Sequence, residues 1–229
     1  MSKKQLAKKQ SPLKIAVIIT LTLFVLIVAL VVIKNSGSED GEAGSFDTPP
    51  SLEGQPVMGE ESAPVTVTVF GDYMCPSCKA WEMDIFPQLE KDYITTGDVK
   101  LSAVNVLFHG QDSETAALAS EQVLAEDPKS FWDFHHKVFE SQAEHGEKWV
   151  TPNKMAEIAE ETTSVDPDEL VDKLSAKTFA EQLQTDTELY KKYNVQSTPT
   201  IMINGKTVNE VFDYNKIKEM IDEELGNAK

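Results

Sequence analysis

Residues 65–78 read Val-Thr-Val-Thr-Val-Phe-Gly-Asp-Tyr-Met-Cys-Pro-Ser-Cys, and Cys75 and Cys78 are the only two cysteines in the 229-residue chain. Apolar and polar residues alternate over 64–70, which predicts a half-buried strand, and Gly71-Asp72 ends it. Beyond the cysteines, apolar residues recur four apart, which predicts a helix with a core-facing stripe (Trp81, Ile85, Leu89). The cysteine pair therefore lies where a strand passes into a helix.

This position predicts that the first cysteine is the reactive one. Proline is favoured at the first helical position, so Pro76 makes Cys75 the expected N-cap residue. The backbone N–H groups of Ser77 and Cys78 and the positive end of the helix dipole would then stabilise the Cys75 thiolate and lower its pKa. Cys78 lies three residues further on the same helix face, within reach of a disulfide. Pro76 and Ser77 are accordingly candidates for tuning that pKa.

A zinc site, a structural disulfide and a pair of free thiols are each less consistent with the sequence than a redox pair. A zinc site needs about four ligands, and the chain has no second cysteine pair to complete one. A purely structural disulfide normally closes a long loop, because closing two residues constrains the unfolded chain little. Two unpaired buried thiols are unusual outside the cell. The redox interpretation is therefore favoured.

The N-terminal region predicts a membrane anchor. Residues 1–13 are basic and residues 14–34 contain nineteen consecutive uncharged residues, 15–33, long enough as a helix to span a bilayer core of about 30 Å. Lysines before the span place the N-terminus in the cytoplasm and the rest of the chain outside. A cleaved signal peptide with a site at Ser36-Gly37-Ser38 is the alternative, although its apolar region is usually about 7–15 residues. Residues 35–53 predict a flexible acidic linker, and 54–229 a single domain.

Charge excludes a nucleic-acid binder. All 21 basic residues are lysine, and six of them lie within residues 1–34, so the remaining 15 face 38 acidic residues, a net charge of −23. With no arginine, the chain also lacks the usual residue for bidentate phosphate recognition. We interpret the acidic excess as a solvated surface, and a structural cation held by surface carboxylates is a weaker hypothesis.

The order of predicted elements is β-α-β, a helical block, then α-β-β-α. Residues 99–108 predict a second strand, and helical periodicity follows over about 110–190. Asp127-Pro128 and Asp166-Pro167 are each candidates for a cap and first turn. Near the end, two strands flank Asn204-Gly205, a favoured two-residue hairpin turn.

Several stretches outside the strand–helix junction resemble one protein family. Residues 56–59 with Ala63-Pro64, residues 70–78, the run Phe131-Trp-Asp-Phe-His-His136, and Ser197-Thr-Pro-Thr200 are similar to the DsbA-like thiol–disulfide oxidoreductases over about residues 54–225. With the anchor, they resemble the membrane-tethered oxidases of this family in Gram-positive bacteria. The resemblance implies an α/β thioredoxin fold with an inserted helical domain, preceded by one transmembrane helix.

The resemblance also implies roles for individual residues. Cys75 would be the attacked and attacking sulfur and Cys78 its resolving partner. Pro199 would be a cis-proline facing the pair, and the backbone of Thr198 would present itself to a substrate chain. The family implies no cofactor other than the redox-active disulfide Cys75–Cys78.

This chain departs from the family pattern at two positions. Many thioredoxin-like proteins have a buried acid six residues before the first cysteine, where this chain has Val69. Asp72 is the nearest carboxylate; it either relays a proton to Cys78 or satisfies the turn before the helix. Ser77 stands where DsbA has a histidine that depresses the thiol pKa, and it offers only a neutral hydrogen bond.

The histidines predict no metal site. His135 and His136 are adjacent and point about 100° apart on a helix, so both do not easily face one ion. His109 and His145 are the only others. We predict that Trp132 and Phe139 pack in the core rather than contact a substrate.

The sequence thus predicts an extracytoplasmic, single-pass membrane protein that introduces disulfide bonds into secreted or surface proteins. By resemblance, a membrane quinone reductase of the DsbB type would reoxidise it. A thiol reductase, serving for example cytochrome c maturation, uses the same residues, and an anchored non-enzymatic binding module is a further alternative.

Overall fold

The structure is a computed structural model that describes residues 44–143 and 148–228. The predicted anchor, residues 14–34, and most of the predicted linker lie outside these ranges. Within the described ranges, no helix combines the length and the apolar character needed to cross a membrane.

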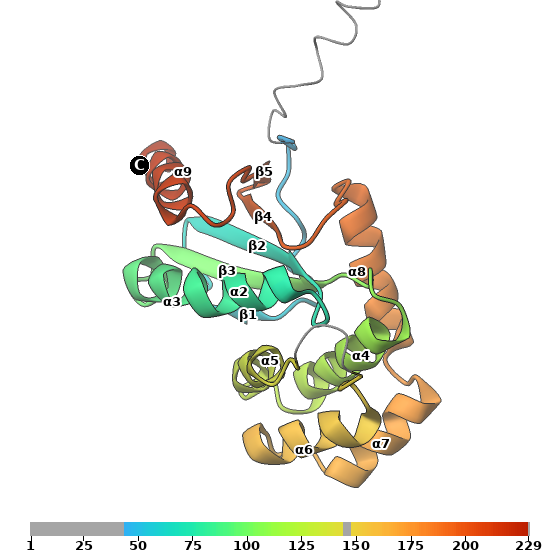
Figure 1. Ribbon diagram of the computed structural model, residues 1–229. Coiled ribbons are helices and arrows are strands. Elements are labelled where there is room, and N and C mark those ends of the chain that lie inside the picture. The colour runs from blue at the N-terminus through green and yellow to red at the C-terminus, as the bar shows by residue number, and fades with distance from the viewer. Residues whose placement is uncertain (1–43, 144–147, 229) are drawn as a thin grey trace, which may run out of the picture. The chain divides into compact units, whose positions relative to one another are not determined.

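The central sheet has five strands in the order β1-β3-β2-β4-β5 (Figure 1). β2 and β3 are parallel, with Val65 opposite Val99, whereas the other neighbouring pairs are antiparallel. The predicted first strand is therefore central, and its C-terminal end leads into the cysteine pair. The strand bounds are β1 Val57–Met58, β2 Val65–Gly71, β3 Val99–Asn105, β4 Thr200–Ile203 and β5 Lys206–Thr207.

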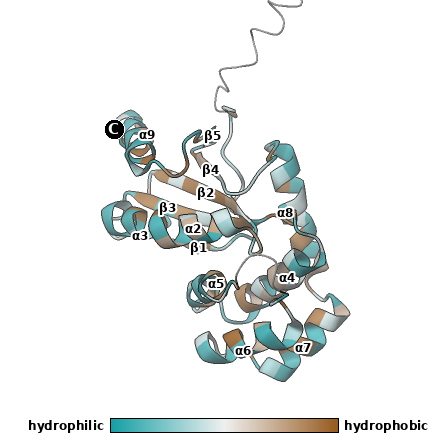
Figure 2. Ribbon diagram, viewed as in Figure 1, coloured by the Kyte–Doolittle hydropathy of each residue, from teal (hydrophilic) through white to brown (hydrophobic). Residues whose placement is uncertain are grey.

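Alternation along the strands gives the sheet two apolar faces. On one face, Val65 and Val67 pack in a core with α2 (Pro76–Asp84), α3 (Phe86–Leu89) and α9 (Tyr214–Asn227). On the other, Phe70 and Met202 pack with α8 (Ala180–Lys192). Apolar colour follows the strands in Figure 2, because both of their faces are covered.

The helix after the cysteines is interrupted, as its proline suggests. α2 ends at Asp84 and α3 begins at Phe86, with Pro87 in the first turn of α3. Proline has no N–H to donate to the carbonyl four residues earlier, so the helix cannot continue regularly through this point. A π-helix, η1 (Glu90–Ile94), follows α3.

A helical block is inserted between β3 and β4 and has its own apolar core. Tyr73, Cys75 and Cys78 belong to this core, so the cysteine pair lies where the block meets the sheet domain. The sequence predicts this insertion at about 110–190, and the helices of the block run from Gln111 to Lys192. The block consists of α4 Gln111–Glu126, α5 Phe131–Glu140, α6 Pro152–Thr162, α7 Pro167–Ala176 and α8.

Of the two predicted Asp-Pro helix starts, one is confirmed and one is wrong. Asp166 is the N-cap of α7 and accepts a hydrogen bond from the Glu169 N–H at 3.0 Å. Asp127 instead follows the end of α4, and α5 begins only at Phe131. The Asp127 carboxylate accepts from the backbone and hydroxyl of Ser164, both at 2.9 Å, and thereby fixes the α6–α7 connection.

The chain contacts the sheet earlier than the predicted domain start at residue 54. Ser45 forms a β-bridge with Lys206 on the edge strand β5, and the Phe46 N–H donates to the Gly205 carbonyl at 3.1 Å. The Phe46 ring also packs edge-on against Tyr193, with centroids 4.8 Å apart. Residues 44–46, which the sequence assigned to the linker, therefore pair with an edge strand that would otherwise expose unpaired backbone groups.

The predicted hairpin is confirmed. β4 and β5 are joined by Asn204 and Gly205, whose φ angles of 48° and 86° are both positive. These are the angles of a two-residue type I′ turn.

The cap of α7 provides a test of local stability. We expect Asp166→Ala to lower the free energy of unfolding by about 1 kcal/mol, because the Glu169 N–H loses its acceptor. Asp166→Asn, which preserves a capping oxygen, should stay close to the original protein. Urea unfolding of the three proteins measures the difference, and equal stability of the alanine variant would contradict the cap assignment.

Candidate active site

The cysteine pair occupies the first turn of α2. Cys75 is the N-cap residue with extended backbone angles (φ −82°, ψ 118°), and Pro76 follows at the first helical position, as predicted. The turn that leads into the helix is fixed at Asp72, whose carbonyl accepts from the Cys75 N–H at 2.9 Å. Both cysteines are free thiols in this structure and both are largely buried, at 7% and 3% exposed.

The environment of Cys75 favours its thiolate. A hydrogen bond from the Cys78 thiol makes the largest contribution to lowering the pKa of Cys75, and burial acts in the opposite direction. Thr198 and the backbone N–H groups of Cys78 and Ser77 lower the pKa further, so that it falls from 9.0 to about 5. The sulfur makes no capping hydrogen bond of ordinary geometry, which differs from the expected arrangement. The helix N-terminus therefore acts on the sulfur as a weaker electrostatic contribution than the neighbouring thiol.

Cys78 has the opposite environment. Its hydrogen bond to Cys75, its burial and the negative charge on Cys75 all raise the pKa of Cys78 above its ordinary value. Its sulfur accepts one hydrogen bond from the backbone N–H of Asp72, at 3.4 Å. The pair therefore combines one sulfur that ionises readily with one that retains its proton.

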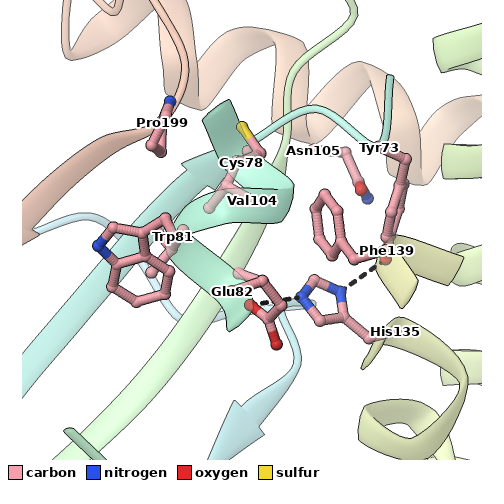
Figure 3. A pocket seen from close by; sticks show the side chains of 12 residues that line it. Tyr73, Cys78, Trp81, Glu82, Val104, Asn105, His135, Phe139 and Pro199 are labelled. Atoms are coloured by element: carbon pink, nitrogen blue, oxygen red, sulfur yellow. Dashed lines mark hydrogen bonds and ion pairs between the residues drawn. The ribbon is translucent and has the colours of Figure 1, made fainter. Parts of the chain in front are cut away.

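The loop before β4 faces the cysteines. The Thr198–Pro199 peptide bond is cis, as the resemblance implied. The Cys75 thiol donates to the Thr198 carbonyl at 3.3 Å, and Pro199 lines the same pocket as Cys78 (Figure 3). Thr198 and Pro199 are thus brought to the pair from a segment more than a hundred residues away.

Asp72 does not contact the cysteines through its carboxylate. Its Oδ1 accepts from the Met74 N–H at 2.8 Å, while its Oδ2 accepts from Ser113 Oγ at 2.9 Å, the Phe108 N–H at 2.9 Å and the His109 N–H at 3.3 Å. The His109 ring adds a contact at 2.8 Å. Donors from the turn and from the start of the helical block thus surround this buried carboxylate. The geometry favours the turn-satisfying role over the proton relay.

Pro76 and Ser77 lie on the exposed side of the motif. Their contribution to the site is backbone geometry: Pro76 starts the helix, and the Ser77 N–H helps to lower the pKa of Cys75.

A second group of titratable side chains lies beneath the cysteines, and sequence analysis missed it. Glu82 on α2 is buried between His135, 3.8 Å from one carboxylate oxygen, and His136, which contacts the other oxygen. The other ring nitrogen of His135 hydrogen-bonds the Tyr73 hydroxyl at 2.7 Å. Burial alone would raise the pKa of Glu82, but hydrogen bonds and charge from the two histidines outweigh it and hold the pKa at about 2.

Glu82 itself is the feature of the sequence that could have revealed this cluster. Glu82 immediately follows Trp81 in the apolar stripe of a predicted amphipathic helix, where an acid requires a partner. Adjacent histidines on a helix do not easily face one metal ion, yet these two share one carboxylate because each contacts a different oxygen. Burial of Phe139 and the partial burial of Trp132 confirm their prediction as core residues.

The helical block is also tied to the motif by polar contacts. Lys79 donates to the carbonyls of Glu140 and Gln142, at 3.1 and 2.8 Å, at the end of α5. The Gln142 amide in turn donates to the Tyr73 carbonyl at 2.8 Å. These bonds fix α2 and the cysteine loop against α5.

Among the described residues, no group of three or more His, Cys, Asp or Glu side chains is arranged to hold a metal ion. The hypothesis of a cation on surface carboxylates remains a prediction. The arrangement at the cysteines requires none: a nucleophilic thiolate, a protonated neighbour within disulfide reach and an adjacent backbone carbonyl suffice for thiol–disulfide exchange.

The asymmetry of the two thiols predicts a specific pH profile. Alkylation of the reduced protein by iodoacetamide should follow a single ionisation with a midpoint near pH 5, because only Cys75 ionises in the accessible range. An alkylation midpoint near pH 8.5, as in an ordinary thiol, would contradict the geometry.

The lowered pKa of Cys75 also links stability to pH. The reduced protein should gain stability relative to its unfolded chain as pH rises from about 5 to 9, and lose it again as pH falls.

Comparisons with known proteins agree with the fold and the motif. A sequence profile of the family described as thioredoxin matches residues 51–223. Disulfide bond formation protein D of Bacillus subtilis (strain 168) is 50% identical over 191 residues, 83% of this chain and 86% of that protein. The crystal structure of oxidised BdbD from Bacillus subtilis is similar with a TM-score of 0.78 and 51% identity, over 80% of this chain and 98% of that chain. Chlamydia trachomatis DsbA has the same fold, with a TM-score of 0.68 at 24% identity over 79% of this chain and 96% of that chain.

Proposed function

This chain belongs to the thioredoxin family and, within it, to the DsbA-like disulfide bond formation proteins, and from that premise we propose how its Cys75–Cys78 pair serves other proteins. It is a thiol–disulfide oxidoreductase that catalyses disulfide bond formation. The direction of the reaction rests on the contact between the two sulfurs: the hydrogen bond from the Cys78 thiol lowers the pKa of Cys75 to about 5, and the same bond raises the pKa of Cys78.

The reaction begins from the disulfide form. A substrate thiolate attacks the Cys75 sulfur; the Cys75–Cys78 bond breaks, and its electron pair goes to Cys78, which takes up a proton. A second substrate thiolate then attacks the substrate sulfur of the mixed disulfide and releases Cys75 as a thiolate. Because that thiolate is stabilised, the reduced enzyme is favoured and the disulfide passes to the substrate.

The substrate chain lies along the segment before β4. The Thr198 carbonyl, which accepts from the Cys75 thiol in the free protein, becomes available when Cys75 is joined to a substrate. A substrate backbone N–H can then take its place, with Pro199 fixing the direction of the carbonyl. This geometry requires only a backbone N–H of the substrate and no particular side chain, which suits an enzyme that serves many secreted or surface proteins.

The location and the redox partner follow from chemistry and from the sequence. An oxidase needs an oxidising compartment, and residues 14–34, uncharged from 15 to 33, would supply a single-pass anchor with the catalytic domain outside the cytoplasm. Each cycle leaves a reduced pair, so an electron acceptor is required, and a DsbB-like membrane quinone reductase fits an anchored enzyme. A reductase with the same motif is less favoured, because a strongly depressed Cys75 pKa opposes donation of electrons to a substrate disulfide.

Cysteine variants test this assignment. We expect Cys75→Ala to abolish oxidation of a reduced, unfolded protein substrate, because no attacked sulfur remains. Cys78→Ala should accumulate mixed disulfides through Cys75, visible on non-reducing gels and removed by dithiothreitol. Unchanged activity of Cys75→Ala would contradict the proposal, and Ser77→Ala provides a control that retains both sulfurs.

Membrane location has a separate test. The full-length protein should sediment with membranes and be digested by protease added outside intact cells, whereas a variant lacking residues 1–34 should stay in the soluble fraction inside the cell, protected from the protease. A full-length protein that retains residues 1–34, by mass, and yet is found in the soluble fraction would contradict the anchor. Loss of those residues from the mature protein would instead indicate the cleaved signal peptide.

A further inference from the structure

The reaction requires a proton at a buried sulfur. Cys78 is 3% exposed, and it must gain a proton when the disulfide opens and lose it when the disulfide forms again. A bare thiolate in this position is costly, since burial and the neighbouring sulfur both favour the thiol. A titratable group with access to Cys78 and to solvent would remove that cost.

Asp72, the nearest acid in the sequence, is poorly placed for this role. Its Oδ2 is surrounded by donors from Phe108, His109 and Ser113, and only its backbone N–H reaches the Cys78 sulfur. The Asp72 carboxylate is therefore engaged by the turn and by the start of the helical block, and its oxygens do not contact the Cys78 sulfur.

A small pocket joins Cys78 to the buried cluster on α2 and α5. The pocket has a volume of about 20 Å³, and Cys78, Tyr73, Glu82 and His135 all line it (Figure 3). A cavity needs about 10–15 Å³ to hold one water molecule, and a buried water needs about 2–4 polar partners. Glu82 also lies four residues after Cys78 on α2, so the two side chains project from the same side of that helix.

Val69 lines this same pocket from β2. A Cβ atom on Gly71 would lie 4.0 Å from both a Val69 methyl carbon and the Cys78 sulfur, so both side chains border the space beside Gly71. The apolar Val69 offers no proton acceptor on that side. The acid and the imidazole that face the pocket come instead from α2 and α5.

The cluster continues to solvent. Glu82 contacts His136 with its other oxygen, and the His136 side chain is 31% exposed whereas that of Glu82 is 5% exposed. The remaining titratable neighbours are the Tyr73 hydroxyl on His135 and, acting on Tyr73 from α4 and α8, Glu121 and Asp186. These contacts form a continuous series of polar groups, from His135 at the pocket through Glu82 to the partly exposed His136.

We propose that the Glu82–His135–His136 cluster is the proton reservoir of Cys78, exchanging its proton through a water in the pocket, an inference that rests on the proposed disulfide exchange. When the disulfide opens, the electron pair of the Cys75–Cys78 bond goes to Cys78, and His135 passes a proton through the water to that sulfur. His136 then recovers a proton from solvent. When the disulfide forms, the Cys78 proton follows the reverse route, the Cys78 thiolate attacks Cys75, and the bound thiolate leaves.

A purely structural role predicts a different outcome. Glu82 also joins α2 to α5, so its loss could loosen the site as a whole. That loosening would change the reactivity of Cys75 as well, because Cys75 is on the same helix. A proton-transfer role changes only the steps in which Cys78 gains or loses its proton.

The test uses the full-length chain and measures two reactions separately: closure of the disulfide by Cys78, and alkylation of Cys75 by iodoacetamide. The reduced protein is mixed with oxidised glutathione, and stopped-flow tryptophan fluorescence follows the closure step in which Cys78 expels glutathione from Cys75, between pH 5 and 8. Glu82→Gln keeps the shape of the side chain, and Asp84→Asn, an exposed position on the same helix, is the matched loss of one carboxylate.

We expect Glu82→Gln to slow closure about tenfold or more, a modest share of the about 10²–10⁴-fold that a positioned acid–base supplies. Its iodoacetamide profile should keep the midpoint near pH 5, and Asp84→Asn should match the original protein in both assays. Closure by Glu82→Gln at the original rate across this pH range would overturn the proposal, as would a matching loss of Cys75 reactivity.

A second variant covers the case in which Glu82→Gln does not fold. His136→Ala leaves the buried carboxylate in place and opens the solvent end of the cluster; its closure should be slow and should recover on addition of imidazole. Slow closure that imidazole does not restore, or closure at the original rate, would contradict the route. If the unaltered protein forms no mixed disulfide and expels no glutathione, the proposed function itself fails, which is a different result from equal rates in the variants.

Discussion

The hydrogen bond between the two thiols of the motif is the interaction on which this active site depends. It is the largest cause of the low pKa of Cys75 and the largest cause of the high pKa of Cys78. One contact therefore prepares both sulfurs for opposite tasks, one to leave as an anion and the other to remain protonated. Ser77 has no charged side chain, so most of this asymmetry comes from the two sulfurs, from burial and from backbone groups.

The fold surrounds this contact with three supports. The end of β2 and the Asp72 turn set the position of Cys75 at the start of α2. The segment before β4 brings the Thr198 carbonyl to the sulfur from the opposite side. The helical block covers Cys78 and, through α5, supplies the histidines that contact the Glu82 carboxylate beneath it. Removal of any one support would leave the cysteine spacing intact but change the environment that sets their pKa values.

Patterns among residues close in sequence predict most of the fold. The Cys75–Cys78 spacing with Pro76, the Asn204-Gly205 turn and the Asp166 cap all act between residues close in sequence, and the structure confirms each of them. Phe46 and Asp127 were misassigned because their partners, Gly205 and Ser164, lie far along the chain. The sharing of Glu82 by His135 and His136 was missed for the same reason: it depends on how α5 packs on α2, which no local pattern reports.

The reduction potential of the full-length chain in glutathione buffers tests the central claim most directly. If the stabilised Cys75 thiolate makes the reduced form favourable, the potential should lie above about −200 mV, among the oxidising members of the thioredoxin fold. A potential below about −250 mV would show that the contacts around Cys75 do not stabilise its thiolate enough to drive disulfides into substrates. That result would contradict the account of how this site works.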